Sequence, residues 1–173
     1  MLAAKQVEQP FAVFISSSQS EFRDFRKTLK IDIDEQRWSS LRPMRAILIE
    51  NQRGAMIPTE IRKGIDQSSI YVGIFGKKWS DWTVAEFRYA RIRGLPLLVY
   101  KFTRGTHGQA GRKSRVDDFL NKEVKQVGIR LREPYRSLDR LGVEILGDLV
   151  IQSVEMVRES SDVRKLINTG LSL

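Results

Sequence analysis

Short apolar runs alternate along the chain with segments in which apolar residues recur at helical spacing, and this alternation predicts the fold. Runs of this length, rich in aromatic and β-branched residues, are typical of buried parallel strands. We expect five strands, at Phe11–Ile15, Ala46–Glu50, Ser69–Gly76, Leu95–Phe102 and Val127–Leu131. The helical spacing predicts helices at Glu21–Lys30, Thr59–Gln67, Thr83–Arg93, Val116–Val124 and Ser137–Glu159.

Strands that alternate with helices predict an α/β fold, because parallel strands need helical crossovers that cover both faces of the sheet. We expect a flavodoxin-like three-layer sandwich around a five-stranded parallel sheet in the order 2-1-3-4-5. Residues 1–161 should form this single domain, followed by a loosely held C-terminal tail at 162–173. Ligands of such sheets bind beyond the carboxyl ends of the strands, where the connections change direction. A site should therefore lie among the polar residues that follow the strands, at Ser16–Ser18, Glu50, Gly76–Trp82 and Lys101–Arg104.

The helical spacing also predicts which sides of two helices are buried. In the helix Thr83–Arg93, the residues Ala85, Tyr89 and Ile92 recur on one side. In the helix Ser137–Glu159, the side expected to be buried comprises Val143, Leu146, Val150, Val154 and Val157.

Glu86 is the candidate catalytic residue, because a helix that begins at Thr83 places this carboxylate in its first turn, at the carboxyl edge of the sheet. Trp79 and Trp82, in the preceding turn, could supply flat apolar walls for a base or a nicotinamide ring, or could instead be core or partner-contact residues. Glu86 also has a structural alternative. Thr83 and Glu86 fit a capping box, in which the carboxylate returns a hydrogen bond to the helix N-terminus, and a first-turn carboxylate interacts favourably with the helix dipole.

Further candidates lie beside the same edge of the sheet. Those expected to contact substrate are Ser16, Ser17, Ser18, Gly76, Trp79, Trp82 and Arg104. The three serines could hydrogen-bond a ribose or a phosphate, or could only cap the next helix, for which Ser18 and Glu21 fit a capping box. Arg104 opens a basic, glycine-rich loop and could screen a pyrophosphate. A solvated loop without a ligand is the alternative there.

The segment around Glu86 resembles two enzyme families. The run WTVAE at 82–86 resembles the Trp-x-x-x-Glu element of Toll/interleukin-1 receptor (TIR) domains, and VFISSSQSEF at 13–22 resembles their first-strand motif. Read as T-x-x-E-x-x-x-A with a later G-x-P, the same stretch is similar to the glutamate motif of nucleoside 2-deoxyribosyltransferases. From about Phe11 to Phe102 the chain is also similar to an uncharacterised TIR-like family found at the front of signal-transduction (STAND-type) ATPases, through VFISS, IYVGI-x-G and a T-x-x-E helix.

Both enzyme resemblances imply cleavage of an N-glycosidic bond at a ribose C1′, with Glu86 meeting the sugar. An oxocarbenium-like transition state needs a nearby negative charge, and an unperturbed glutamate is ionised at neutral pH. Nicotinamide leaves NAD as a neutral molecule from a cationic ring, so no general acid is required, whereas release of a base from a neutral nucleoside usually wants a protonated group. We therefore expect a TIR-like NAD glycohydrolase with a role in defence or signalling, with NAD as substrate and without a cofactor or metal.

Two alternatives stay open. The first is a catalytically silent TIR-like module that senses a nucleotide or self-associates, since the turn before Thr83 has no glycine and Ser69 stands where the TIR-like family usually has an aspartate. The second is a nucleoside deoxyribosyltransferase-like enzyme. The TIR resemblance implies a homo-oligomer formed through TIR-like contacts, with NAD or another nucleotide as the ligand.

The amino-acid composition excludes some functional classes and some partners. The 173 residues include no cysteine and one histidine, His107, which excludes cysteine nucleophiles and Cys/His zinc sites. Lys and Arg number 30 against 21 Asp and Glu, and the net charge of +9 favours anionic partners. Aromatic residues are not interleaved with basic ones as in an RNA-binding sheet, so nucleic acid is not an expected partner. Lys5 and Glu8 interrupt any signal-like apolar run, and no stretch reaches the ~20 residues of a membrane helix, which predicts a cytoplasmic protein without a membrane partner.

Overall fold

The computed structural model describes residues 10–35, 43–49, 59–103 and 114–170, with the side chains of 133 and 162–170 left out. Its centre is a five-stranded parallel sheet in the order β2-β1-β3-β4-β5. The strands are β1 (Phe11–Ser17), β2 (Met44–Ile47), β3 (Ile70–Phe75), β4 (Leu97–Phe102) and β5 (Leu131–Tyr135). This order confirms the flavodoxin-like α/β fold predicted from the alternation of apolar runs and helices.

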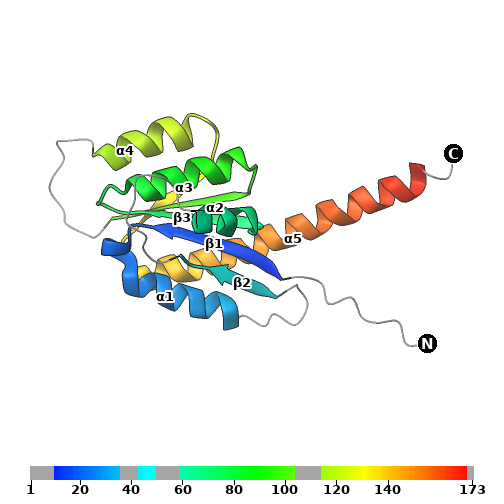
Figure 1. The fold of residues 1–173 in the computed structure, drawn as a ribbon, viewed down its shortest axis with the longest axis horizontal. Coiled ribbons are helices and arrows are strands. Elements are labelled where there is room, and N and C mark those ends of the chain that lie inside the picture. Colours follow the sequence, from blue (N-terminus) through cyan, green and yellow to red (C-terminus); the bar gives the residue numbers. More distant parts are fainter. Residues whose placement is uncertain (1–9, 36–42, 50–58, 104–113, 171–173) are drawn as a thin grey trace.

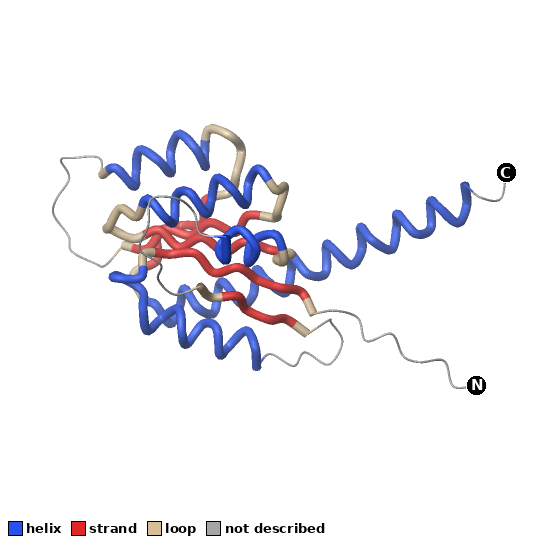
Figure 2. Tube along the Cα trace, in the orientation of Figure 1, coloured by secondary structure: helices blue, strands red, loops and turns tan. Residues whose placement is uncertain are grey.

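Helices cover both faces of the sheet (Figures 1 and 2). One face carries α1 (Gln19–Glu35) and α5 (Leu138–Gly170). The other face carries α2 (Thr59–Asp66), α3 (Asp81–Ile92) and α4 (Arg115–Phe119), and α4 continues as the π-helical segment η1 (Leu120–Lys125). The three layers explain why the strands read as nearly continuous apolar runs, since neither side of the sheet faces water.

The two central strands are buried along their whole length. Every residue of β1 and β3 is buried. Val13 and Ile15 belong to the hydrophobic cluster shared with α1 and α5, whereas Phe14 belongs to the cluster shared with α2 and α3. The Phe14 ring stacks on that of Tyr71 with an interplanar angle of 10°. Successive side chains of β1 therefore face opposite helix layers. The same alternation determines which layer each serine at the end of β1 faces.

The fifth strand lies further along the chain than predicted, at Leu131–Tyr135 rather than Val127–Leu131. Val127 is 51% exposed, and Gly128 has a φ of 80° directly after η1. The amide of Gly128 donates to the carbonyl of Lys125 at 3.1 Å. A left-handed glycine therefore ends the helix at this point, and the apolar residues around it do not enter the sheet.

The buried sides of α3 and α5 also differ from those predicted. In α3 the buried residues are Thr83, Val84, Phe87 and Ala90. Of the predicted residues, Tyr89 is partly buried and packs against the cluster of this face, whereas Ile92 is 78% exposed. In α5 the buried residues include Leu141, Ile145 and Leu149. Of the predicted residues, Leu146 and Val157 are partly buried and pack against this cluster, whereas Val143 is 70% exposed. Each helix carries apolar residues on more than one side, and the side that faces the sheet is the one that becomes buried.

The last helix continues through the segment predicted to be a loosely held tail. α5 is one helix to Gly170, so the expected boundary at residue 161 falls within it. Its C-terminal part leads away from the sheet (Figure 1). In the described ranges, none of the helices has the length and apolar character that crossing a membrane requires.

Candidate functional site

A cavity of about 350 Å³ lies at the carboxyl end of β1. Its walls come from the end of β1, the first turns of α1, the loop before α3 and the first turns of α3, with apolar surface added by Ile49 and Ile61. This is the edge at which a parallel sheet of this topology binds ligands. Five of the candidate residues line this cavity, namely Ser17, Ser18, Trp79, Trp82 and Glu86.

Glu86 reaches the cavity because α3 begins earlier than predicted. The helix starts at Asp81, and its N-cap is Ser80, whose Oγ accepts a hydrogen bond from the amide of Thr83 at 3.2 Å. The hydroxyl of Thr83 also donates to Ser80 Oγ, at 3.0 Å. Thr83 is thus inside the helix and the capping box of Thr83 and Glu86 is not formed. Glu86 lies in the second turn of α3. Its carboxylate contacts a residue distant in the sequence and not the N-terminus of its own helix.

That contact is with β1. The hydroxyl of Ser16 donates a hydrogen bond to the Glu86 carboxylate. Ser16 is fully buried, and the fully buried ring of Tyr71 on β3 belongs to the same environment, since its pKa responds to both Ser16 and Glu86. Ser16 is not among the residues that line the cavity. Ser16 thus contacts the candidate catalytic carboxylate of Glu86, whereas a direct contact with a ligand was expected.

Burial is the main influence on the ionisation of this carboxylate. It raises the pKa of Glu86 from 4.5 to about 7, while the Ser16 hydrogen bond and the positive charge of Arg26 act in the opposite direction. Burial, and then the charge of Glu86, raise the pKa of Tyr71 well above its ordinary value of 10.0, so this phenol stays neutral. Near neutral pH both forms of Glu86 are present. The ionised form can stabilise a cation, and the protonated form can donate a proton.

Glu21 connects α1 to the loop before α3. Its carboxylate accepts hydrogen bonds from the backbone amides of Lys77 and Lys78, at 2.9 and 3.0 Å. The capping box of Ser18 and Glu21 is therefore not formed. Gly76 permits this contact, because a methyl group at that position would collide with the Glu21 carboxylate. Gly76 does not line the cavity that contains Glu86 and lies against the Glu21 carboxylate instead.

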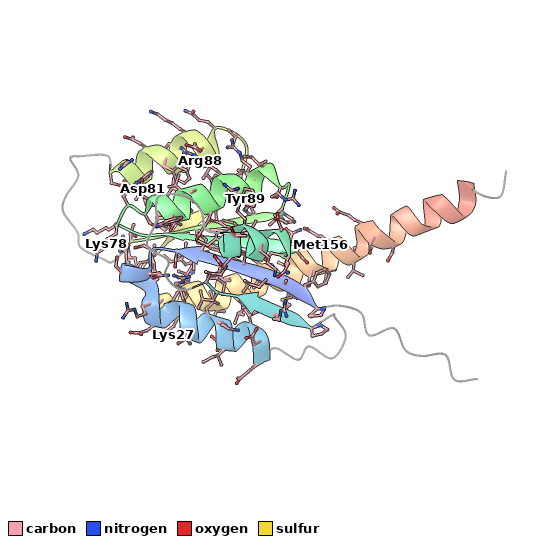
Figure 3. The ribbon with its side chains drawn as sticks, in the orientation of Figure 1. Lys27, Lys78, Asp81, Arg88, Tyr89 and Met156 are labelled. Atoms are coloured by element: carbon pink, nitrogen blue, oxygen red, sulfur yellow. The ribbon has the colours of Figure 1, made fainter. Side chains whose placement is uncertain are left out.

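The two tryptophans are held differently. The guanidinium of Arg115 lies over the Trp79 ring, 4.1 Å from its centroid, and Phe119 packs edge-on at 6.0 Å. The indole of Trp79 also donates to Asp81 at 2.6 Å, at the end of the molecule where Figure 3 labels Asp81. Trp82 lines the cavity and packs against the hydrophobic cluster of this face. Trp79 is thus tied to α4, which leaves Trp82 as the better placed wall for a ligand ring.

Arg26 of α1 is a cavity residue that the sequence reasoning missed. It is 5% exposed, lines the cavity and donates from Nη2 to the carbonyl of Ile49 at 3.1 Å. The available signal was its place in the buried stripe of α1, where Phe22, Leu29 and Ile33 are the other members. A cation in an apolar stripe indicates an internal polar partner or a site. Glu50 and Arg104, which were also expected at this edge of the sheet, lie outside the described residues.

Comparison with known protein families identifies the family to which this chain is similar. The chain matches the family described as "Domain of unknown function (DUF4062)" over residues 12–150. The match covers all of the sheet except Phe11, the first residue of β1, and it includes every residue that lines the Glu86 cavity. No curated protein shows significant similarity to the chain.

Proposed function

The chain belongs to the DUF4062 family, and we propose that it is a TIR-like NAD glycohydrolase whose active site is the Glu86 cavity. The observation that carries this proposal is the position of the Glu86 carboxylate, which lines a cavity of about 350 Å³ and is held by Ser16 from a neighbouring strand. A bond returned to the helix N-terminus would have favoured a purely structural role. The volume is in the range of small-molecule sites, roughly 300–1,000 Å³.

In the proposed reaction the bond between ribose C1′ and the nicotinamide nitrogen breaks. Its electron pair leaves with the ring, so nicotinamide departs as a neutral molecule and positive charge develops at C1′. The ionised carboxylate of Glu86 stabilises this ribosyl cation. Water then adds to C1′ and loses a proton, so that NAD and water give ADP-ribose, nicotinamide and H⁺.

The neighbouring residues have separate roles in this proposal. Ser16 is a positioning residue, because its hydroxyl holds the Glu86 carboxylate and lowers its pKa, which favours the ionised form. Trp82 forms a wall for the leaving ring, and Ser17 and Ser18 meet the ribose. We expect the reaction to take place in the cytoplasm, in a homo-oligomer assembled through TIR-like contacts.

Incubation of the full chain with NAD tests the proposal. We expect release of nicotinamide, and a loss of at least about 100-fold in kcat/KM for Glu86→Gln, since removal of one stabilising group of an active site typically has this effect. Glu60→Gln is the matched control, because Glu60 is an exposed glutamate in the first turn of α2. The assay should span a wide range of protein concentration to allow assembly. Cleavage by Glu86→Gln at the wild-type rate contradicts the proposal.

A nucleoside deoxyribosyltransferase-like reaction is a second candidate for the same cavity. The pKa of about 7 leaves part of Glu86 protonated near neutral pH, which suits a leaving base that needs a proton. Nucleosides in place of NAD would then release free base. A nucleotide-sensing or self-associating module would instead bind NAD or assemble without yielding product.

A further inference from the structure

The lining of the Glu86 cavity is divided by charge. Among the described residues its two carboxylates, Asp81 and Glu86, both belong to α3. The part formed by the end of β1 and the first turns of α1 is polar and basic, with Ser17, Ser18, Gln19, Ser20 and Arg26 as its residues. Glu21, the acidic residue of this turn, is directed to the amides of Lys77 and Lys78. The cavity therefore presents a cation on its α1 side and carboxylates on its α3 side.

Arg26 is placed where an apolar residue would be expected to stabilise the fold better. Its side chain is 5% exposed and shares a helix face with Phe22 and Leu29. A guanidinium stays charged at all accessible pH values, and burial of a charge costs several kcal/mol before compensation. The Ile49 carbonyl takes one hydrogen bond from Nη2. A guanidinium at a cavity wall is also the side chain best matched to a phosphate, because its planar donors pair with two phosphate oxygens.

From this arrangement, and resting on the proposed ribosyl chemistry at Glu86, we propose that Arg26 binds the phosphate of the substrate and that the substrates are 5′-phosphorylated ribosyl donors. The substrate class is then a ribose with a cationic ring at C1′ and a phosphate or pyrophosphate at C5′. Such a molecule has the same charge division as the cavity, with its cationic end at Glu86 and its anionic end at Arg26. The hydroxyl of Ser20, which lies 3.2 Å from that of Ser18 in the same cavity lining, adds a donor for the phosphate oxygens.

The contact between Arg26 and the Ile49 carbonyl offers a purely structural explanation, and the two roles predict different selectivity. A structural role affects every substrate by the same factor. The same holds for the charge of Arg26 on Glu86, which lowers the pKa of that carboxyl whatever is bound. Only a phosphate contact changes the ratio between substrates with and without a phosphate.

Three substrates with the same leaving group make this ratio measurable, namely NAD, nicotinamide mononucleotide and nicotinamide riboside. We expect wild-type kcat/KM to be at least about tenfold higher for the two phosphorylated substrates, since a charge-assisted bidentate contact has this order of strength. Arg26→Gln should remove most of that advantage, chiefly through KM, and leave nicotinamide riboside within about twofold. Arg26→Lys should retain part of it. Measurements at about pH 9, above the Glu86 pKa of about 7, favour the ionised carboxylate and so reduce the effect of the Arg26 charge on its ionisation.

Arg26→Met supplies a variant that fills the buried position if the others fold poorly, and binding of ADP-ribose against ribose by calorimetry gives a readout without turnover. Equal cleavage of all three substrates by the wild type, or an equal loss for all three in Arg26→Gln, overturns the phosphate role and leaves the glycohydrolase proposal standing. Absence of cleavage, with ADP-ribose binding that is lost in Arg26→Gln, overturns the glycohydrolase and supports the phosphate site. Absence of both cleavage and Arg26-dependent binding overturns both.

Discussion

The carboxylates of Asp148 and Glu86 both lie inside the protein, but their hydrogen-bond and ion-pair partners differ. Asp148 of α5 is buried, accepts a hydrogen bond from the Tyr100 hydroxyl at 2.7 Å and pairs with Arg132 at 2.5 Å. These partners lie on β4 and β5, so Asp148 fastens the last helix to the edge of the sheet. Glu86 is held by the neutral hydroxyl of Ser16 and faces a cavity.

The difference shows how burial can serve either stability or chemistry. The Arg132 guanidinium and the Tyr100 hydroxyl both bind the Asp148 carboxylate and offset the cost of burying its charge. Burial, together with the hydrogen bond to Asp148, raises the pKa of Tyr100. At Glu86 the effect of burial exceeds that of its neighbours, and its pKa rises to about 7. A carboxylate in this state is more reactive and costs the fold stability at high pH, which is typical of functional sites.

The largest expected effect on stability is at Asp148. Asp148→Asn leaves the Arg132 charge without its ion-pair partner, and we expect a loss of about 3 kcal/mol in the free energy of unfolding, since breaking an internal ion pair is strongly destabilising. Urea unfolding measures the loss, and Asp139→Asn, at an exposed position of the same helix, is the control. NAD cleavage per folded molecule should stay at the wild-type level. A large loss of activity with unchanged stability would place Asp148 in the functional site instead.

Glu86→Gln should have the opposite effect on stability. The pKa of Glu86 is raised in the folded state, from 4.5 to about 7. Its stabilising contribution is therefore complete below about pH 4.5 and is lost as the pH rises through about 7. We expect Glu86→Gln to gain about 2 kcal/mol relative to the wild type between pH 5 and pH 9, because glutamine does not ionise. A difference between the two proteins that does not change with pH would show that Glu86 is not perturbed by burial.

The Glu21 carboxylate differs from both Asp148 and Glu86, since two backbone amides hold it. Glu21→Gln replaces one acceptor oxygen by a donor, and we expect a loss of about 1 kcal/mol in unfolding free energy. The loop before α3 should loosen, which tryptophan fluorescence reports through Trp79 and Trp82, and KM for NAD should rise a few-fold. Asp24→Asn, an exposed change on the same helix, should alter none of these. Unchanged fluorescence and KM in Glu21→Gln would mean that the loop does not depend on this contact.

Most of the fold could be predicted because its signals are local. Apolar runs at β1, β3 and β4 and helical spacing between them predict a parallel α/β sheet, and the order 2-1-3-4-5 is the one typical of the flavodoxin-like fold. The fifth strand could not be placed correctly because VGI reads equally well as a strand and as the end of a helix, and the left-handed Gly128 decides between them. The buried faces of α3 and α5 depend on the position of the sheet, which spacing alone does not contain.

The site was harder to predict, since its contacts join distant parts of the chain. The motif around Glu86 and the serines after β1 could be found, but the bond between Ser16 and Glu86 is a property of the folded sheet. The N-cap shows the same limit, because Ser80 and Thr83 are both good capping residues and the packing of Thr83 into the core selects Ser80. Arg26 gave only the weak signal of a charge in an apolar stripe.

The pH dependence of kcat/KM for NAD tests the central claim most directly, because it reports the ionisation of the free protein. The groups that face Glu86 are Ser16 on β1, Arg26 on α1 and Tyr71 on β3, with Asp81 in the same cavity, and of these Arg26 stays charged and Tyr71 neutral. If ionised Glu86 is the stabilising group, kcat/KM rises to a plateau with an inflection near pH 7, and the inflection moves to higher pH in Ser16→Ala because that hydrogen bond lowers the Glu86 pKa. A flat profile, or one that falls through neutral pH, would contradict an ionised Glu86 as the group that stabilises the ribosyl cation.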